Sequence, residues 1–346
     1  MFDLRVVRKV LIIKLRYIGD VVLTTPIAEA LDRALPEASI DMLVNEGTEE
    51  VLQNNPHVGA VLVVPRKMGW RQIGLIRELR RKRYDLILDL TDGDRAAILG
   101  FLSGARRRIG FNHEHRWRGI LYQRVVAADR ATLHAVDYHR TMLQALGCDV
   151  DLKAPRLYVS ERDRSQAGAL LRRIRIDEDA PIFLISPGAR WWFKSWPAER
   201  FGALAAEIHR TFGFFAVVVG GKKDRKEANE IMASCGAWAG SLAGESTILE
   251  TAALAERAKF FVGNDAGPMH VAAAMGTPVV ALFGPTDPRM WGPVGEGHRI
   301  LWKGVDCSPC WRDHDCGRGD FNCMRQITVS ETFEAVRSLI KERGDA

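Results

Sequence analysis

Short apolar runs alternate with longer amphipathic segments along the chain, which is the pattern of strands and helices in an α/β protein. In the first half, the predicted strands are residues 9–14, 39–44, 60–64 and 84–89, and the predicted helices are 21–35, 49–54, 73–83 and 138–146. Because strands and helices alternate at short spacing, this half is predicted to form a parallel, doubly wound sheet.

A second series of the same kind begins at Pro181. Its predicted strands are 181–186, 214–219, 259–262 and 278–283, and its predicted helices include 197–211, 248–257, 269–275 and a last helix at 330–343. The stretch between the two series, 149–179, contains a charged helix and is predicted to connect them. We therefore expect two Rossmann-like α/β domains, at 1–165 and 175–329, and a C-terminal helix within 330–346 that packs back on the first domain.

One cationic segment, residues 106–118, interrupts the alternation. Its arginines and two aromatic residues show neither a strand period nor a helix period, so we predict a loop. Its cations are Arg106, Arg107, Arg108, Arg116 and Arg118.

Composition and charge narrow the class of protein. The chain has 346 residues, of which 47% are hydrophobic and 27% charged, as in soluble globular proteins. No apolar run reaches the roughly 18 residues of a membrane span, and charged residues near the N-terminus argue against a signal peptide, so we expect a cytoplasmic protein.

The charge is unevenly distributed along the chain. Residues 1–175 hold 30 Lys and Arg against 21 Asp and Glu, a balance of +9, whereas 176–346 hold 19 against 22, a balance of −3. This basic first half indicates an anionic partner, such as a phosphorylated lipid, a membrane surface or nucleic acid, unless it serves solubility alone.

The first candidate site is Gly19-Asp20, directly after the first predicted strand. A carboxylate at the carboxyl edge of a sheet can take a proton from a hydroxyl nucleophile, and glycine before it allows close approach of a substrate. The alternative is that Asp20 only caps the helix that follows.

A second candidate is Ser186-Pro-Gly-Ala-Arg190 together with Lys194. A glycine-containing loop before a helix can hold a diphosphate, and a lysine can neutralise a departing phosphate. Neither the G-x-x-x-x-G-K-[ST] pattern nor a G-x-G-x-x-G after a strand occurs, which disfavours a P-loop and a nicotinamide cofactor. Lys194 could also be a surface lysine beside half-buried aromatic residues.

The third candidate is Val262-Gly-Asn-Asp-Ala-Gly-Pro-Met-His270, which is predicted to be strand, polar loop and helix. Ligands bind at the carboxyl ends of parallel strands, and the N–H groups of a helix start suit phosphate. Asp265 is therefore either a ligand contact or a helix cap.

Two further motifs offer metal chemistry. Asp92-Gly-Asp94 could bind a divalent cation, although a capped turn is the favoured interpretation. Cys307, Cys310, Cys316 and Cys323, with His314 between them, could bind zinc, but the last two do not form a C-x-x-C pair. Reduced thiols are the alternative that a cytoplasmic setting favours.

Four segments together resemble the ADP-heptose:lipopolysaccharide heptosyltransferases, glycosyltransferase family 9, over nearly the whole chain and in the same order. They are 12–26, 186–190 with 193–197, 219–221, and 262–270 with 282–286. The aromatic run at 191–196 resembles the heptosyltransferase III subgroup more than I or II. The Cys-Ser-Pro-Cys loop also resembles a feature of some members.

This resemblance implies a GT-B fold, with two Rossmann-like domains facing a central cleft, and inversion at the anomeric carbon without a metal or other cofactor. It implies that Asp20 is the general base and that Lys194 stabilises the departing diphosphate of ADP-heptose. The implied donor contacts are Gly188, Ala189, Arg190, Asp265, Ala266, Gly267 and His270. Ala189 and Arg190 stand where some members have hydroxyl residues, so backbone N–H groups or Arg190 would replace those contacts.

The implied acceptor is a phosphorylated lipid A–Kdo or heptose-bearing core at the inner leaflet, on which the protein would be peripheral. The basic residues expected to meet it are Arg16, Arg107, Arg108, Arg116 and Arg118. Nucleic acid is disfavoured because no basic recognition helix is present. Two alternatives stay open: a related nucleotide-sugar transferase or epimerase with another donor or acceptor, and a non-catalytic lipid- or polysaccharide-binding protein.

Overall fold

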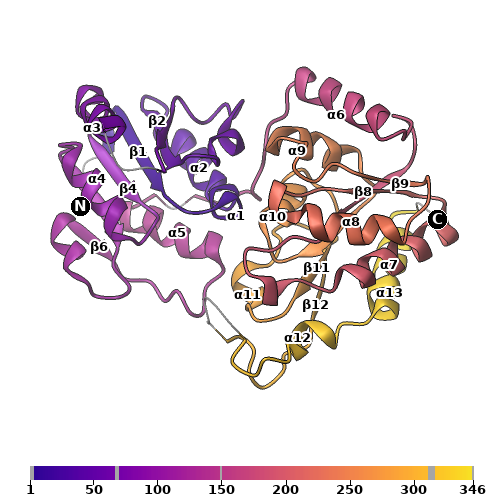
Figure 1. Ribbon diagram of the computed structural model, residues 1–346. Coiled ribbons are helices and arrows are strands. Elements are labelled where there is room, and N and C mark those ends of the chain that lie inside the picture. Colours follow the sequence, from indigo (N-terminus) through magenta and orange to yellow (C-terminus); the bar gives the residue numbers. More distant parts are fainter. Residues whose placement is uncertain (1–3, 67–69, 149, 311–315, 345–346) are drawn as a thin grey trace. The chain divides into compact units, whose positions relative to one another are not determined.

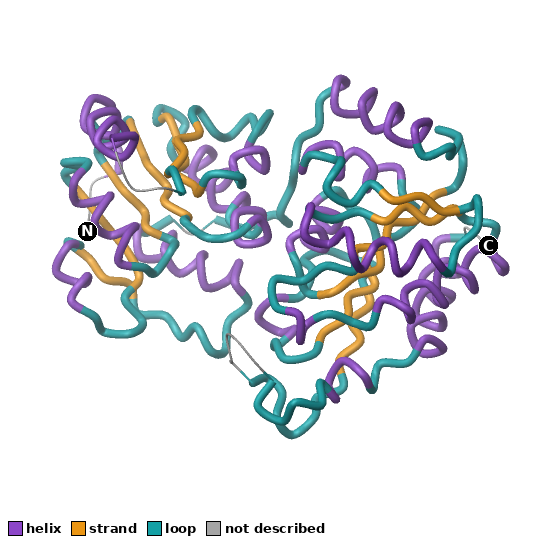
Figure 2. Tube along the Cα trace, viewed as in Figure 1, coloured by secondary structure: helices purple, strands orange, loops and turns teal. Residues whose placement is uncertain are grey.

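The computed structural model describes residues 4–66, 70–148, 150–310 and 316–344. The chain divides into two compact units, Met1–Tyr158 and Val159–Ala346. Each unit has one six-stranded, fully parallel sheet with helices on both of its faces (Figures 1 and 2). The predicted α/β class, with two Rossmann-like units, is therefore confirmed.

The first sheet has the strand order β3-β2-β1-β4-β5-β6. Its strands are β1 Lys9–Lys14, β2 Ser39–Asn45, β3 Val61–Val64, β4 Leu86–Asp89, β5 Arg107–Phe111 and β6 Arg124–Val126. Its helices are η1 Leu4–Val6, α1 Ile18–Val22, α2 Thr25–Ala34, η2 Glu49–Leu52, α3 Trp70–Lys82, α4 Asp94–Leu102, η3 Trp117–Leu121 and α5 Ala135–Leu146. The chain starts at β1 in the middle of the sheet and later restarts at β4 on the other side. The strand order therefore reverses between β1 and β4, and such switch points are where open α/β sheets bind ligands.

The second sheet repeats this topology in the order β12-β11-β10-β7-β8-β9. Its strands are β7 Ile182–Ser186, β8 Phe215–Val218, β9 Ala239–Ser241, β10 Phe261–Asn264, β11 Val279–Phe283 and β12 Arg299–Trp302. Its helices are α6 Glu161–Arg173, η4 Trp192–Lys194, α7 Ala198–Phe212, η5 Lys222–Asp224, α8 Arg225–Ala233, α9 Ile248–Arg257, α10 Gly267–Ala274, α11 Pro288–Trp291, α12 Asn322–Arg325 and α13 Val329–Arg343. The corresponding switch point lies between β7 and β10.

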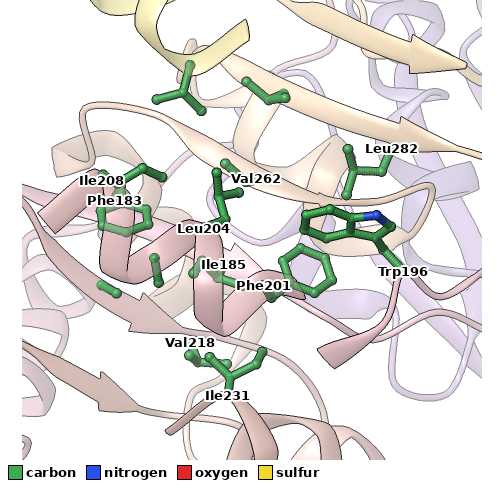
Figure 3. Close-up of a cluster of buried hydrophobic side chains, with 14 of the residues drawn as sticks. Phe183, Ile185, Trp196, Phe201, Leu204, Ile208, Val218, Ile231, Val262 and Leu282 are labelled. Carbon is green, nitrogen blue, oxygen red and sulfur yellow. The ribbon is translucent and has the colours of Figure 1, made fainter. Parts of the chain in front are cut away.

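Apolar cores fill both faces of the second sheet. On one face, side chains of β7, β8 and β10 pack against α7, α8 and α13 (Figure 3). Trp196, from the loop before α7, is inserted into this core beside Phe201 and Leu282, and its Nε1 donates a hydrogen bond of 2.9 Å to the Ile327 carbonyl. The loop that carries Lys194 is therefore anchored in the core two residues further along.

The prediction that the cationic segment 106–118 is a loop is partly wrong. Arg107–Phe111 forms β5, which pairs in parallel with β4 and buries Ile109 and Phe111. Two arginines and a glycine interrupt the apolar pattern of this segment. Its sequence alone therefore does not predict a strand, and only its pairing with β4 shows that it is one. The edge strand β6 and the short strands β9 and β12 were likewise not predicted.

The predicted helix 21–35 is divided into α1 and α2. The hydroxyls of Thr24 and Thr25 donate to the carbonyls of Asp20 and Val22, and Pro26 occupies the start of α2. Hydroxyl groups that bind backbone carbonyls and a proline without an N–H both favour a break between helices. Asp20 consequently lies within α1 rather than before the helix.

The unit boundary differs from the predicted domain boundaries. Helix α6 packs on α9 and belongs wholly to the second unit, whereas the predicted boundary at 165 would cut through it. The last helix, α13, packs on α7, β11 and β12, and Phe333, Val336 and Ile340 are part of the core of the second unit. The last helix is therefore part of the core of the second unit, and its expected packing on the first domain stays a prediction. Within the described residues, no helix combines the length and the apolar character that a bilayer span requires.

Candidate functional site

Polar side chains gather at the switch point of each sheet. In the first unit, Lys14 ends β1, Asp20 follows it, and Thr91 follows β4. In the second unit, the loop from Pro187 to Lys194 follows β7, and Asp265 follows β10. Because the strands are parallel, the residues that follow β1 and β4 meet at one edge of their sheet, as do those that follow β7 and β10.

Asp20 is held in place at the first of these edges. Its side chain is 18% exposed, its Oδ1 lies 3.7 Å from Lys14 Nζ, and its Oδ2 accepts a hydrogen bond of 3.4 Å from the Tyr17 N–H. Tyr17 is the N-cap of α1 and Asp20 is its third residue, so Asp20 is not the N-cap itself. Part of the carboxylate is thus exposed, so it can accept a proton from a bound ligand.

Lys14 and His139 form a buried support for Asp20 that was not predicted. Lys14 Nζ donates to the Leu90 carbonyl at 3.0 Å and lies 2.9 Å from His139 Nε2. Burial lowers the pKa of Lys14 to about 8, a shift that the charge of Asp20 opposes. Burial first, and then the charge of Lys14, hold the pKa of His139 well below its usual value, so its ring is neutral and can accept from the ammonium.

Arg118 lies at the same edge but is a buried structural residue. It is 1% exposed, and its guanidinium bonds to Asp92 at 2.7 Å, to Asp94 at 3.0 Å and to Glu114 at 3.1 Å. A side chain so enclosed has no surface for a substrate, which corrects its expected role as an acceptor contact. Asp92 is occupied by this ion pair, so its interpretation as a structural turn fits better than the metal alternative.

The other arginines expected to bind the acceptor fall into two groups. Arg107 and Arg108 begin β5 beside the start of β4. They therefore lie at the amino-terminal end of the strands, whereas Asp20 follows the carboxyl end of β1. This placement separates them from Asp20, and their expected contact with the acceptor stays a prediction. Arg16 lies in the β1–α1 loop and donates to the Thr91 carbonyl at 3.1 Å, and Arg116 is half-exposed and pairs with Asp94. Arg16 and Arg116 thus stay as acceptor candidates.

The second unit brings Lys194 and Asp265 together, although 71 residues separate them. Lys194 Nζ donates to Asp265 Oδ2 at 3.1 Å, and the Thr286 hydroxyl donates to the same oxygen at 2.6 Å. The side chains of Lys194 and Asp265 are 17% and 11% exposed. This pair lies where α10 begins, so the ammonium and the Gly267 N–H can face one anionic ligand. Pro268 has no N–H, and the Met269 N–H donates to the Ala266 carbonyl at 3.1 Å. Thr286 was not predicted as part of the site.

Asn264 fixes the lysine loop to the sheet. Its Oδ1 accepts from the Trp196 N–H at 3.0 Å, and its Nδ2 donates to the Pro187 carbonyl at 2.7 Å. The side chain is almost completely buried, so no water can replace these bonds. One amide therefore ties both ends of the 187–196 loop to β10, and local sequence did not reveal this role.

We expect Asn264→Ala to lower the free energy of unfolding by about 2–4 kcal/mol, because two buried backbone groups lose their partners at about 1–3 kcal/mol each. Urea denaturation measures the change. The matched control is Ser186→Ala: Ser186 Oγ is buried nearby and finds no hydrogen-bond partner among the described residues, so its removal should change stability little. Equal losses in the two variants would contradict the assignment.

The predicted donor loop is shaped by Asp224. A Cβ on Gly188 would lie 2.4 Å from the Asp224 carboxylate, so only glycine fits there. Lys223 Nζ donates to the Ala189 carbonyl at 3.0 Å, and the exposed guanidinium of Arg190 stacks 4.7 Å over the Trp191 ring. These contacts hold the backbone of the 188–190 loop beside the Gly220–Asp224 turn.

The remaining predicted donor residues belong to α10 and the turn before it. Ala266 and Gly267 are half-exposed at the start of the helix, as a ligand contact requires. His270 is 6% exposed, so little of its side chain can reach a ligand.

The four cysteines line one cavity of about 210 Å³ together with Phe193, Pro285 and Phe321. All four are free thiols, and burial raises the pKa of Cys323 to about 11. Among the residues described, no group of three or more His, Cys, Asp or Glu has the arrangement of a metal site. His314, the expected fifth member, lies outside the described residues.

Comparison with known proteins gives one consistent family. Residues 73–317 match glycosyltransferase family 9 (heptosyltransferase). The chain is 32% identical over 308 residues to lipopolysaccharide heptosyltransferase 3 of Escherichia coli, covering 84% of this chain and 87% of the relative. It is 28% identical over 351 residues to lipopolysaccharide heptosyltransferase 2 of Salmonella typhimurium, covering 97% and 99%.

A solved structure shows the same likeness. The structure of E. coli ADP-heptose lipopolysaccharide heptosyltransferase II matches with a TM-score of 0.80 at 27% identity, over 97% of this chain and 99% of that chain. The similarity therefore extends through both units.

Proposed function

The chain belongs to glycosyltransferase family 9 and is a glycosyltransferase, and from this premise we propose that it transfers heptose from ADP-heptose to the lipopolysaccharide core with inversion at the anomeric carbon. The observation that carries the proposal is the pair of half-buried groups, Asp20 and Lys194, each placed at the switch point of its own sheet. The names of the relatives supply the substrate class.

On the acceptor side, we assign Asp20 as the general base. Its carboxylate takes the proton of the acceptor hydroxyl while the hydroxyl oxygen attacks the anomeric carbon from the face opposite the leaving group. A single displacement of this kind inverts the configuration at that carbon. Arg16 and the half-exposed Arg116 are the cations that would meet acceptor phosphates, since both lie at the same edge as Asp20.

On the donor side, the bond between the anomeric carbon and the diphosphate oxygen breaks, and ADP leaves with the electron pair. Lys194, with the N–H groups of Ala266 and Gly267 at the start of α10, stabilises the negative charge that develops on the diphosphate. The loop 188–190 contributes backbone N–H groups beside it. We assign this charge stabilisation to protein groups rather than to a divalent metal, so EDTA should leave the rate unchanged.

Lys14 is the positioning residue of this arrangement. Lys14→Met should lower turnover about tenfold without changing ADP-heptose affinity, because the carboxylate of Asp20 loses its nearest fixed cation. The pH profile separates this role from a merely structural one. The pKa of Lys14 is about 8, so its charge is progressively lost and the wild-type rate should fall as pH rises through about 8. A wild-type alkaline limb that persists unchanged in Lys14→Met would contradict the assignment.

The proposed place of action is the cytoplasmic face of the inner membrane, where a lipid-linked acceptor would be reached by a peripheral protein. A related transferase with another donor is the runner-up. Calorimetric competition distinguishes the two: the proposal predicts that ADP displaces the donor and that UDP does not. Tighter binding of UDP would favour the alternative.

A further inference from the structure

Five large apolar side chains of the first unit are exposed on three neighbouring elements, α4, η3 and β6. Single exposed apolar residues are ordinary, but a cluster of them marks an interaction surface. Ile120 is 82% exposed and Trp117 is 49% exposed. We call this cluster the α4–η3 face, and its members are Ile98, Phe101, Trp117, Ile120 and Val125.

Contacts between the three elements make the α4–η3 face continuous. Helix α4 packs on η3. Arg108 bridges them, because its guanidinium lies 5.2 Å over the Phe101 ring while its Nε donates to the Leu121 carbonyl at 2.8 Å. Val125 Cγ2 on β6 lies beside η3, 3.9 Å from where a Cβ on Gly119 would be. β6 is the edge strand of its sheet, so no further strand covers this side.

The same region concentrates positive charge. Residues 94–126 contain seven arginines and two acidic residues, a balance of +5 within a chain of net charge +6. Arg95, Arg106 and Arg124 are exposed among the apolar members. Arg80 at the end of α3 donates to the Leu102 carbonyl at 2.8 Å, which places the basic last turn of α3 beside α4.

We propose that the α4–η3 face seats the protein on an anionic membrane surface. Tryptophan and isoleucine side chains surrounded by arginine match a bilayer interface, where apolar groups enter the acyl boundary and cations meet lipid phosphates. A second copy of this chain fits poorly, because the exposed arginines of two such faces would repel each other. The inference rests on the proposed function only in that a lipid-linked acceptor gives the docking a purpose.

This assignment accounts for the arginines that lie away from Asp20. Arg107 and Arg108 begin β5 at the end of the strands opposite the candidate base, and Arg108 contacts the face through the Phe101 ring. Their charge attracts the membrane rather than holding the reacting sugar. Each such cation near an anionic surface strengthens binding about fivefold, and the attraction weakens as salt rises.

Co-sedimentation of the full chain with vesicles tests the proposal without donor or acceptor. The vesicles are phosphatidylcholine alone or with about a third phosphatidylglycerol, and binding should require the anionic lipid and fall with salt. Trp117→Ser/Ile120→Ser should weaken binding at least about tenfold, and Arg106→Glu at least about fivefold. The controls are Ile300→Ser on β12 and Arg210→Glu on α7, which remove an exposed isoleucine and an exposed arginine of the second unit and should bind as wild type.

Binding that is unchanged in Trp117→Ser/Ile120→Ser, or absent in the wild type, would overturn the proposal. A concentration-dependent dimer that the same variant abolishes in sedimentation velocity would assign the face to a second copy and also overturn it. Thermal melting checks that each variant is folded.

Transfer to a deacylated, water-soluble acceptor separates this inference from the proposed function. There the Trp117→Ser/Ile120→Ser variant should match the wild type, whereas on vesicle-embedded acceptor it should be slower. If the wild type binds anionic vesicles through this face but transfers no sugar to any acceptor, the proposed function fails and the docking surface stands.

Discussion

Asp20→Asn is expected to lower the rate of sugar transfer by about 10²–10⁴-fold, which is the usual contribution of a general base. The amide has nearly the shape of the carboxylate and can still accept the hydrogen bond from the Tyr17 N–H, so α1 should keep its geometry. It cannot take a proton from the acceptor hydroxyl. The loss should therefore appear in turnover.

Calorimetry with ADP-heptose provides the second half of this test. The proposed donor groups lie in the other unit, so the affinity for the donor should be unchanged in Asp20→Asn and in Asp20→Ala. Asp32→Asn is the matched control, because Asp32 is a more exposed carboxylate of the same unit that pairs only with His57 in the described chain. Retained turnover in Asp20→Asn would remove Asp20 as the base.

Lys194→Ala is the second variant for which we expect a large effect. Removal of one preorganised donor from a developing oxyanion typically costs about 10²–10³-fold in turnover. Lys194 is held by Asp265, which Thr286 also binds, so its ammonium is fixed before the leaving group develops charge. Because the diphosphate is most negative as it departs, turnover should fall more than donor affinity.

The Lys194 test includes two comparisons. Lys194→Arg keeps the charge but changes its geometry and should recover only part of the rate. Lys226→Ala removes a highly exposed lysine of the same unit and should have wild-type kinetics. If Lys194→Ala raised only the donor KM and left kcat intact, the lysine would serve binding and not the departure of ADP.

The candidate site of the second unit was largely predictable from the sequence because its parts follow apolar strands directly. Lys194 and Asp265 each lie in a polar loop that follows a clear apolar run, so both could be predicted as site residues. The parallel pairing of β7 with β10 brings these two loops together. Thr286 follows β11 in the same way but has no charge to mark it. Asn264 ends an apolar strand, and its two bonds to the lysine loop depend on residues about 70 positions away.

The candidate site of the first unit was less predictable because its chemistry depends on buried charge. Lys14 ends an apolar run, where a lysine usually reaches solvent, and only His139, 125 residues later, reveals its burial. Arg118 lies in a run of cations that resembles a solvated loop. It is nevertheless buried, and it pairs with Asp92, which lies 26 residues earlier in the sequence. Local composition carries no information about such partners. The same run of cations also concealed β5, whose arginines and glycine break the apolar strand pattern.

The most direct test of the central claim is mass spectrometry of the acceptor after incubation with ADP-heptose. The acceptors are Kdo-lipid A, alone and with one or two heptoses already attached, so that the reactive core position is identified at the same time. The account predicts that one of them gains the mass of a single heptose while one ADP is released for each sugar transferred. Release of ADP without a gain in acceptor mass, or no reaction with any of the three, would contradict it.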